Sequence, residues 1–426
     1  MTLKFIDLFA GIGGFHEALE SIDATCVFAS EIDLRAREIY LNNRGDNLDG
    51  EFNEDFNEIF LGSIKSQIPK HDILTAGFPC QPFSKSGFQR GLDDIRGNHF
   101  LGIARIIEER QPRVVVLENV RNLVGPKHNQ TWTTIREILR GLGYLLPDIP
   151  TIFSPHLFPP ELGGTPQSRE RVFIVAVRDD RRRKSLVDIQ SPLLNKPFDN
   201  WDPNKWDLAK SVLQKDNQIP NLGEYLLTEE EISVIEIWEE FVNLAGSSDG
   251  RRLPGFPFWA DEFRVKTPDV SGLPLWKVNF ILNNHKFYSS NKAGLFNWLR
   301  KHNYLADLSA SKRKLEWQAD DMSSIWKGLI QFRPSGVRVK KPTYAPALVA
   351  MNQTSIYGPK RRRLTVREAA RLQGFNDSLD FGAQLDSISY KQLGNAVAPK
   401  TALFVLRECS KFWPFFPQDI RDELTK

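Results

Sequence analysis

The sequence predicts an α/β fold with parallel strands. Short apolar runs at 3–9, 25–30, 72–76 and 113–117 have the length and composition of buried strands. Segments with helical spacing separate these runs, and such alternation is typical of a parallel sheet. A glycine-rich turn at 10–14 joins the first strand to a helix. In sheets of this kind, ligands bind beyond the carboxyl ends of the strands, where this turn lies.

The composition is that of an ordinary globular protein. The chain has 426 residues, of which 41% are hydrophobic and 26% charged, enough for two domains and a large core. The net charge of +3 permits nucleic-acid binding without requiring it. We find no signal peptide and no apolar run of membrane-spanning length, so we expect a cytoplasmic protein that does not contact a membrane.

Three cysteines, Cys26, Cys80 and Cys409, are too few for a disulfide framework and indicate a reducing compartment. The sequence contains no CxxC pair and no HExxH motif, so we expect no metal site.

The glycine-rich turn has the spacing GxGG, from Gly11 to Gly14, and not the GxGxxG of dinucleotide-binding proteins. A nucleoside ligand without a pyrophosphate fits this turn better, although a tight turn that binds nothing has the same pattern. Glu31 directly follows the second strand, where an acidic residue commonly accepts hydrogen bonds from ribose hydroxyls.

Cys80 lies in the loop that follows the strand at 72–76, between Pro79 and Pro82. Each proline fixes its own φ and favours an extended conformation in the residue before it, so the loop is stiff and non-helical. A lone cysteine is most often a small core residue. The proline frame and the preceding strand favour a reactive thiol instead.

Charged residues also lie near the ends of two later strands. Glu118 ends the apolar strand at 113–117, and Arg169 and Arg171 come just before the strand at 172–177. If this last strand runs antiparallel, its start lies at the same edge of the sheet as the ends of the others. One edge would then collect Phe9, Glu31, Cys80, Glu118, Arg169 and Arg171.

Residues 186–355 lose the strand–helix alternation and hold eight of the ten tryptophans, which predicts a second domain. Four adjacent cations at 360–363 favour phosphate contact, although such runs are usually solvated faces. Residues 364–373 predict an amphipathic helix that begins near Thr365 and ends at Gly374. A final apolar helix is expected to end near Phe412.

These blocks, in this order, closely resemble the DNA cytosine-5 methyltransferases, particularly the bacterial modification enzymes. The matching blocks are DLFAGIGG at 7–14, Glu31, GFPCQPFS at 77–84, ENV at 118–120, QSRERVFIVA at 167–176, RRLTVREAARLQGF at 362–375 and QLGNAVAP at 392–399. The blocks are distributed over nearly the whole length of the chain outside 180–355.

The resemblance implies a class I S-adenosylmethionine-dependent methyltransferase fold. This is a mostly parallel seven-stranded sheet with one antiparallel strand, accompanied by a smaller target-recognition domain. Residues 1–185, completed by 388–426, would form the catalytic and cofactor-binding domain. Residues 186–387 would form the target-recognition domain and hinge, including the motif helix within 358–375.

The resemblance also implies ligand-binding residues. S-adenosylmethionine would lie over Phe9, Gly11 and Gly13 with its ribose on Glu31, and the further cofactor contacts would be Ile32, Ser63, Ile64, Pro79, Asn395 and Val397. The implied DNA contacts are Gln81, Ser84, Arg361, Arg362 and Arg363. The sequence departs from the family at Ser63, where an acidic residue is common, and at His99, where an apolar residue is common.

The implied reaction is consistent with the chemistry of these side chains. The Cys80 thiolate would add to C6 of cytosine and so make C5 nucleophilic, while Glu118 would hydrogen-bond or protonate N3. Arg171, with Arg169 as a second candidate, would hold the O2 side of the base. A base that the sequence does not identify would then remove the C5 proton. The cytosine must leave the base stack for this chemistry.

We therefore expect a monomeric enzyme that methylates cytosine in a specific sequence of double-stranded DNA and protects it from a cognate restriction endonuclease in a bacterial cytoplasm. Two alternatives are a cytosine-5 methyltransferase acting on RNA and a non-catalytic DNA-binding protein on the same scaffold. A nicotinamide-dependent dehydrogenase is a more distant alternative, because GxGxxG is missing.

Overall fold

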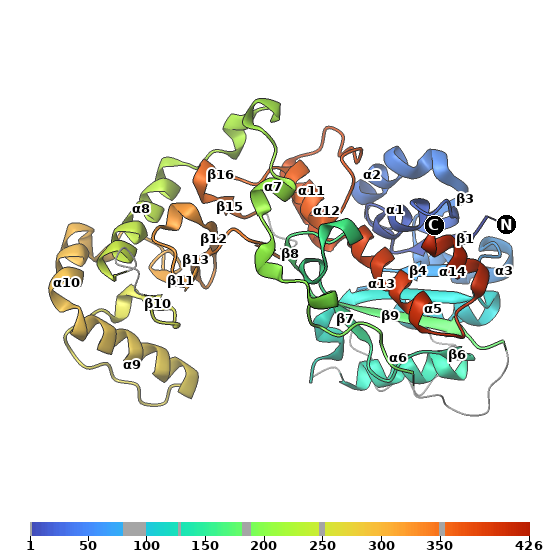
Figure 1. The fold of residues 1–426 in the computed structure, drawn as a ribbon, viewed down its shortest axis with the longest axis horizontal. Coiled ribbons are helices and arrows are strands. Elements are labelled where there is room, and N and C mark those ends of the chain that lie inside the picture. The colour runs from blue at the N-terminus through green and yellow to red at the C-terminus, as the bar shows by residue number, and fades with distance from the viewer. Residues whose placement is uncertain (1, 80–98, 127–128, 181–188, 247–251, 349–353) are drawn as a thin grey trace. The chain divides into compact units, whose positions relative to one another are not determined.

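The computed structural model describes residues 2–79, 99–126, 129–180, 189–246, 252–348 and 354–426 (Figure 1). The chain divides into two compact units. The first comprises Met1–Trp206, Pro346–Met351 and Ala370–Lys426, and the second comprises Asp207–Ala345 and Asn352–Ala369. The functions predicted for 1–185 with 388–426 and for 186–387 stay predictions.

The first unit is built on one sheet with the strand order β3-β2-β1-β4-β5-β9-β6, and β7 also pairs with β9. The strands are β1 (Lys4–Leu8), β2 (Thr25–Ser30), β3 (Leu48–Asn53), β4 (Ile73–Ala76), β5 (Val114–Val120), β6 (Tyr144–Leu145), β7 (Thr151–Phe153) and β9 (Arg171–Arg178). Strands β1 to β5 pair in parallel, and β9 runs antiparallel to β5, β6 and β7. The mostly parallel sheet with one antiparallel strand is confirmed.

The strand count differs from the expected seven for a simple reason. β6 pairs with Val177 and Arg178 at the end of β9, whereas β7 pairs with residues 171–173 at its start. The two short strands therefore share the seventh position in the sheet. β5 also extends to Val120, so Glu118 lies inside the strand and not beyond its end.

Helices cover both faces of this sheet, which explains why its central strands are mostly apolar. Val114 and Val116 pack with the core that includes α1 and α13, whereas Val115 and Leu117 pack with the core that includes α5 and α6. The helices of this unit are α1 (Gly14–Glu20), α2 (Leu34–Arg44), α3 (Ile64–Gln67), α5 (His99–Arg110), α6 (Asn129–Gly141), α12 (Asp386–Asn395), α13 (Pro399–Phe412) and α14 (Gln418–Thr425).

The predicted final helix is α13, which ends at Phe412 as expected, but it is not the last helix. α14 follows it and buries Ile420 and Leu424 against the same core. This short, strongly charged segment gave too little apolar pattern for a prediction.

The second unit contains a sheet of strand order β10-β11-β13-β12-β15-β16. Its strands are β10 (Phe258–Trp259), β11 (Lys314–Gln318), β12 (Leu329–Arg333), β13 (Gly336–Lys340), β15 (Ile356–Tyr357) and β16 (Arg362–Arg363). Its helices are α7 (Leu208–Val212), α8 (Glu229–Leu244), α9 (Leu275–Ser290) and α10 (Lys292–Lys301). Aromatic side chains dominate its core, with Trp238, Phe241 and Trp298 almost fully buried.

The predicted amphipathic helix is α11 (Val366–Gln373). It begins with reciprocal hydrogen bonds, because the Glu368 N–H donates to Thr365 Oγ1 at 3.1 Å and the Thr365 N–H donates to Glu368 Oε2 at 2.9 Å. It ends at Gly374, whose φ of +91° is the left-handed conformation that glycine adopts most readily. Both predicted ends are confirmed.

Candidate active site

Glu118 and Arg171 meet across the β5–β9 pair. Val120 lies opposite Arg171 in the antiparallel register, so Glu118 is the diagonal neighbour of Arg171 on the same face. Arg171 Nε lies 3.1 Å from Glu118 Oε1, and Arg171 Nη1 donates to the carbonyl of Glu170 at 2.9 Å. Two predicted site residues thus form one charged pair.

The environment of Glu118 makes it an unusual acid. The residue is only 7% exposed, and burial raises the pKa of its carboxyl above the ordinary value. The positive charges of Arg171 and Arg169 oppose this shift and favour the carboxylate. A carboxyl group balanced in this way can exchange a proton closer to neutral pH than an exposed glutamate can.

Arg169 lies in a different environment from Arg171. It is fully buried, and its Nη2 donates to the carbonyls of Gly394 at 3.0 Å and Ala396 at 2.8 Å, while Nη1 donates to Leu348 at 3.2 Å. Burial, and then the nearby Arg171, lower the pKa of Arg169 to about 9. Its terminal nitrogens are thus used by the backbone on both sides of Asn395, which favours a positioning role for Arg169.

Asn119 connects the ENV block to the loop that leads to Cys80. Its Nδ2 donates to the carbonyl of Phe78 at 2.9 Å, and its Oδ1 accepts from the Val120 N–H at 2.9 Å. Sequence reasoning assigned no role to Asn119, although its place inside the block was a signal. Pro79, the next residue after Phe78, is exposed, and Cys80, Gln81 and Ser84 lie outside the described residues.

The other two cysteines are poor nucleophiles. Cys26 and Cys409 are both buried. Burial raises the pKa of the Cys26 thiol to about 12, and it raises the pKa of Cys409 as well. Neither thiol is positioned to supply a thiolate at neutral pH.

Each glycine of the GxGG turn has its own structural reason. Gly11 and Gly13 have φ of +57° and +86°, and a Cβ built on Gly11 would meet no atom within 4 Å. A Cβ on Gly14 would lie 2.3 Å from the carbonyl oxygen of Val397. The open space beside Gly11 is suited to a ligand, whereas Gly14 allows the 396–398 segment to approach the turn closely.

Phe9 and Glu31, which flank the glycine turn, are both held in place by their neighbours. Phe9 has φ of +55°, which is rare for a side chain of this size, and its ring lies 5.0 Å from His99 and 4.6 Å from Phe56 between centroids. Glu31 accepts the Gly11 N–H at Oε2 and the Asp33 N–H at Oε1, both at 2.8 Å, and burial raises its pKa. Its carboxylate is therefore fixed in orientation.

The remaining predicted cofactor residues differ in exposure. Ile32 is 67% exposed, Ser63 is exposed as the N-cap of α3, and Ile64 beside it is buried. Asn395, the last residue of α12, is exposed, and Val397 is buried.

Asp7 was not predicted from the sequence. It is the fourth of the five residues of β1, is fully buried and accepts a hydrogen bond from Thr75 Oγ1 at 2.9 Å. Burial raises the pKa of Asp7 to about 8, although the hydrogen bond from Thr75 favours the carboxylate and partly opposes this rise. A buried acid within an apolar strand is detectable in the sequence, but its protonation depends on tertiary burial.

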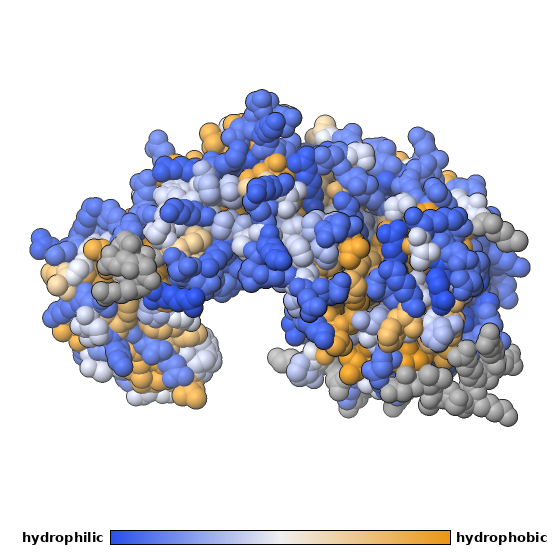
Figure 2. All heavy atoms as spheres, viewed as in Figure 1, coloured by the Kyte–Doolittle hydropathy of each residue, from blue (hydrophilic) through white to orange (hydrophobic). Residues whose placement is uncertain are grey.

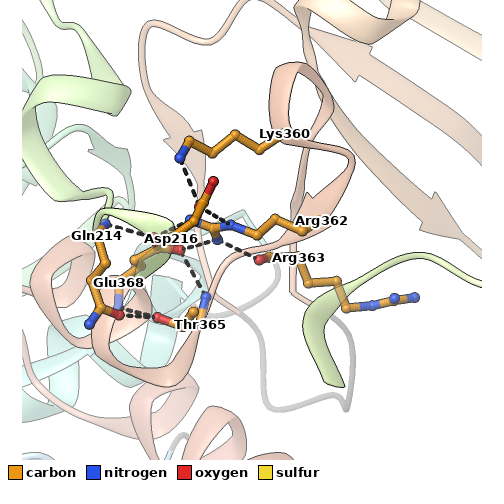
Figure 3. A network of polar contacts seen from close by, with 7 residues as sticks. All are labelled: Gln214, Asp216, Lys360, Arg362, Arg363, Thr365 and Glu368. Carbon is orange, nitrogen blue, oxygen red and sulfur yellow. Dashed lines mark hydrogen bonds and ion pairs between the residues drawn. The ribbon is translucent and has the colours of Figure 1, made fainter. Parts of the chain in front are cut away.

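The four adjacent cations at 360–363 belong to the second unit and have different partners (Figure 3). Lys360 pairs with Asp216 at 2.8 Å, and Arg363 pairs with Glu231. Arg362, only 1% exposed, binds Glu368 through two nitrogens at 2.7 and 2.9 Å. Arg361 is exposed, and its guanidinium lies 4.4 Å from the centre of the Trp326 ring.

Within the described ranges, no cluster of three or more His, Cys, Asp or Glu residues could hold a metal ion. Over the same ranges, no helix combines the length and apolar character needed to cross a bilayer.

Residues 3–411 match the family C-5 cytosine-specific DNA methylase. The Type II methyltransferase M.AluI of Cellulosimicrobium cellulans is 39% identical over 95% of this chain and 91% of its own. The Type II methyltransferase M.BanI of Aneurinibacillus aneurinilyticus is 28% identical over 96% of each. A solved structure, the S. pombe Dnmt2 methyltransferase, is 19% identical over 96% of this chain and 98% of its own, with a TM-score of 0.47.

Proposed function

The chain belongs to the C-5 cytosine-specific DNA methylase family and is a DNA cytosine-5 methyltransferase, and we propose that it uses S-adenosylmethionine, a flipped cytosine and a covalent Cys80 adduct. The observation that carries this proposal is the buried Glu118–Arg171 pair, with Nε and Oε1 3.1 Å apart. Next to Glu118, Asn119 anchors Phe78, two residues before Cys80.

The need for Cys80 follows from the chemistry of cytosine. C5 is a weak nucleophile until a thiolate adds to C6 and breaks the ring conjugation. The buried, high-pKa thiols of Cys26 and Cys409 support the assignment of this step to Cys80. When the adduct forms, Glu118 hydrogen-bonds or protonates N3, and Arg171 orients Glu118 and holds the O2 side.

The glycine turn fits S-adenosylmethionine, which supplies an electrophilic methyl group when bound. The fixed carboxylate of Glu31 would accept the ribose hydroxyls, and the open space beside Gly11 would allow close approach. Phe9 and the exposed Ile32 offer apolar surface beside this turn. The remaining contacts are assigned to Gly13, Ser63, Ile64, Pro79, Asn395 and Val397.

Recognition of one DNA sequence is assigned to residues 186–355, because the motif blocks would serve any cytosine. Gln81, Ser84, Arg361 and Arg363 are proposed to contact DNA, whereas the buried Arg362 would position its neighbours. Catalysis requires the cytosine to leave the duplex, since stacked C6 cannot be reached by a thiolate. We propose a monomer in a bacterial cytoplasm that protects DNA from a cognate endonuclease.

The test is methylation in vitro with labelled S-adenosylmethionine and duplex DNA, followed by bisulfite sequencing to identify the base and its context. RNA of matched sequence should remain unlabelled. Cys80→Ser should remove nearly all turnover, whereas Cys26→Ala and Cys409→Ala should retain it if they fold. Wild type should form a lasting adduct with target DNA carrying 5-fluorocytosine, since fluorine does not leave as a cation. Turnover by Cys80→Ser near the wild-type rate would exclude the covalent mechanism.

A further inference from the structure

Helices α9 and α10 lie within a long stretch of sequence that has no acidic residue. Residues 270–306 contain no Asp or Glu, but they contain Lys277, Lys286, Lys292, Arg300 and Lys301. The whole chain has 56 basic and 53 acidic residues, so its charges nearly balance. This helix pair therefore carries a net positive charge because its cations are not balanced by acids, and the motif blocks give it no role.

Each helix is anchored by one face only. In α9, Asn284 is fully buried, with Oδ1 accepting the Trp259 N–H at 2.8 Å and Nδ2 donating to the Pro257 carbonyl at 2.9 Å. In α10, Trp298 Nε1 donates to the Ile237 carbonyl at 3.0 Å. These bonds hold the helix pair against the rest of the second unit and leave the opposite faces of the two helices in solvent.

The open face of α9 is mixed in character. Residues spaced three or four apart along it are exposed: Trp276, Asn279, Leu282, Asn283 and Lys286. Figure 2 shows polar and apolar residues intermixed over the end of the second unit that carries α9. Protein-binding faces are depleted in lysine at their centre, whereas nucleic-acid interfaces are polar and positively charged.

Three of the cations on α9 and α10 also lack an acidic partner in the described part of the chain, unlike those on the neighbouring sheet. Arg333 and Arg338 share Glu316, and Lys341 pairs with Asp320 and Asp321. In contrast, Lys286, Lys292 and Arg300 are exposed and have no carboxylate partner among the described residues, whereas Lys301 pairs with Glu240 at 2.6 Å. Free cations on a rigid support are the groups that bind phosphates without first breaking an ion pair.

We propose that α9 and α10 bind the phosphate backbone of duplex DNA independently of its sequence, as a grip additional to the contacts that choose the target site. The proposal rests on DNA being the substrate. α9 has 16 residues and is about 24 Å long, enough to cross a major groove of about 12 Å and reach phosphates on both sides. The exposed Trp276 and Asn283 would contact sugars or phosphates between them.

The experiment compares two triple variants that each remove three positive charges from exposed positions of the second unit. The test variant is Lys286→Ala/Lys292→Ala/Arg300→Ala, and the control is Lys215→Ala/Lys266→Ala/Lys327→Ala. Affinity for a duplex without a target site is measured from 50 to 200 mM salt. The slope of log affinity against log salt should fall by up to about 2.7 for the test variant, since each lost phosphate contact contributes about 0.9. The control should keep the wild-type slope.

Equal changes in both variants, or none in either, would overturn the proposal. A test variant that keeps the wild-type slope but dissociates a dimer in sedimentation would overturn it too, and would assign the face to a second protein chain. Lysine acetylation of wild type supplies a measurement that does not depend on variant folding: DNA should protect Lys286 and Lys292 but not Lys215 and Lys266. Methylation of target DNA is measured separately, so failure of the proposed enzyme function is distinguishable from failure of this grip.

Discussion

Arg171 Nε lies 3.1 Å from Glu118 Oε1, because the antiparallel register of β9 on β5 makes the two residues diagonal neighbours on one face of the sheet. If β9 ran parallel to β5, Arg171, its first residue, would lie at the opposite edge of the sheet. The single antiparallel strand of this sheet therefore brings a cation to the edge where the predicted catalytic acid lies.

We expect Glu118→Gln to slow methyl transfer by roughly 100-fold or more, since the amide keeps the size of the side chain but cannot exchange a proton. Single-turnover measurements at saturating cofactor would report this loss. Glu170→Gln is the matched control, because the Glu170 carboxylate pairs with Arg121 and Asn195. If Glu118→Gln weakened only cofactor affinity, Glu118 would be a binding residue.

Arg169→Gln tests the positioning role that its carbonyl partners indicate. The variant leaves the carbonyls of Leu348 and Gly394 without the Arg169 donor, whereas the Ala396 carbonyl still accepts from Gln373 Nε2 at 2.7 Å. A buried unsatisfied group costs about 1–3 kcal/mol. We expect a lower Tm and a higher KM for the cofactor, with a smaller change in kcat. A kcat loss equal to that of Glu118→Gln, at unchanged Tm and KM, would instead place Arg169 at the substrate.

The sequence was sufficient for those features that depend on local pattern. The strands at 25–30 and 172–177 were predictable because both faces of this sheet are buried, and the ends of α11 were predictable from Thr365 and Gly374. The edge that joins Glu118 to Arg171 was predictable once an antiparallel strand was assumed.

Features that depend on distant partners were not predictable. The partners of Arg169 lie up to 227 residues away, so the sequence did not separate its environment from that of Arg171. The strands of the second unit have two to five residues, too few for a period of two to be recognised. The burial of Asn284 likewise depends on partners 25 and 27 residues away, the backbone groups of Trp259 and Pro257.

The two glycines Gly11 and Gly14 should respond differently to alanine. In Gly14→Ala the new Cβ would lie 2.3 Å from the Val397 carbonyl oxygen, and a backbone atom cannot rotate away. We expect a loss of about 1–3 kcal/mol in the free energy of unfolding. The new Cβ of Gly11→Ala meets no atom within 4 Å, and its methyl group occupies the open space. Because alanine must keep the left-handed φ at this position, we expect a loss of about 1–2 kcal/mol in the free energy of unfolding.

Denaturant unfolding and cofactor titration of these two variants would separate the roles. Gly11→Ala should weaken cofactor binding at least tenfold while remaining folded. Unchanged cofactor affinity in a folded Gly11→Ala would move the ligand away from this turn, and an undisturbed Gly14→Ala would show that the 396–398 segment is free to shift.

Asp7 should make the stability of the protein depend on pH. Its pKa is raised by burial from 3.8 to about 8, so the folded state retains a proton that the unfolded chain releases near pH 4. The stability due to this carboxyl is therefore fully present below about pH 4 and is lost as the pH rises toward 8. Asp7→Asn resembles the neutral acid and should become progressively more stable relative to wild type between these limits.

Urea unfolding of both proteins at several pH values from 5 to 9 would give this difference. Using the difference removes the contributions of groups common to both proteins. The exposed Asn42→Ala, which changes no titratable group, should show no such trend. A difference between Asp7→Asn and wild type that does not change with pH would mean that Asp7 is already ionised in the folded protein.

Neighbouring Arg361 and Arg362 should behave as opposites, because one is exposed and the other forms a buried ion pair. Arg361→Ala removes an exposed cation that stacks on Trp326, so we expect little change in stability and a salt slope of DNA binding lower by about 0.9. Arg362→Ala leaves the fully buried Glu368 without its cation, which should cost about 3–5 kcal/mol. Arg362→Met/Glu368→Gln removes both charges, keeps an acceptor for the N–H groups of Thr365 and Gln214, and should recover part of that loss. If Arg362→Ala were as stable as wild type and lowered the salt slope like Arg361→Ala, Arg362 would be a phosphate contact after all.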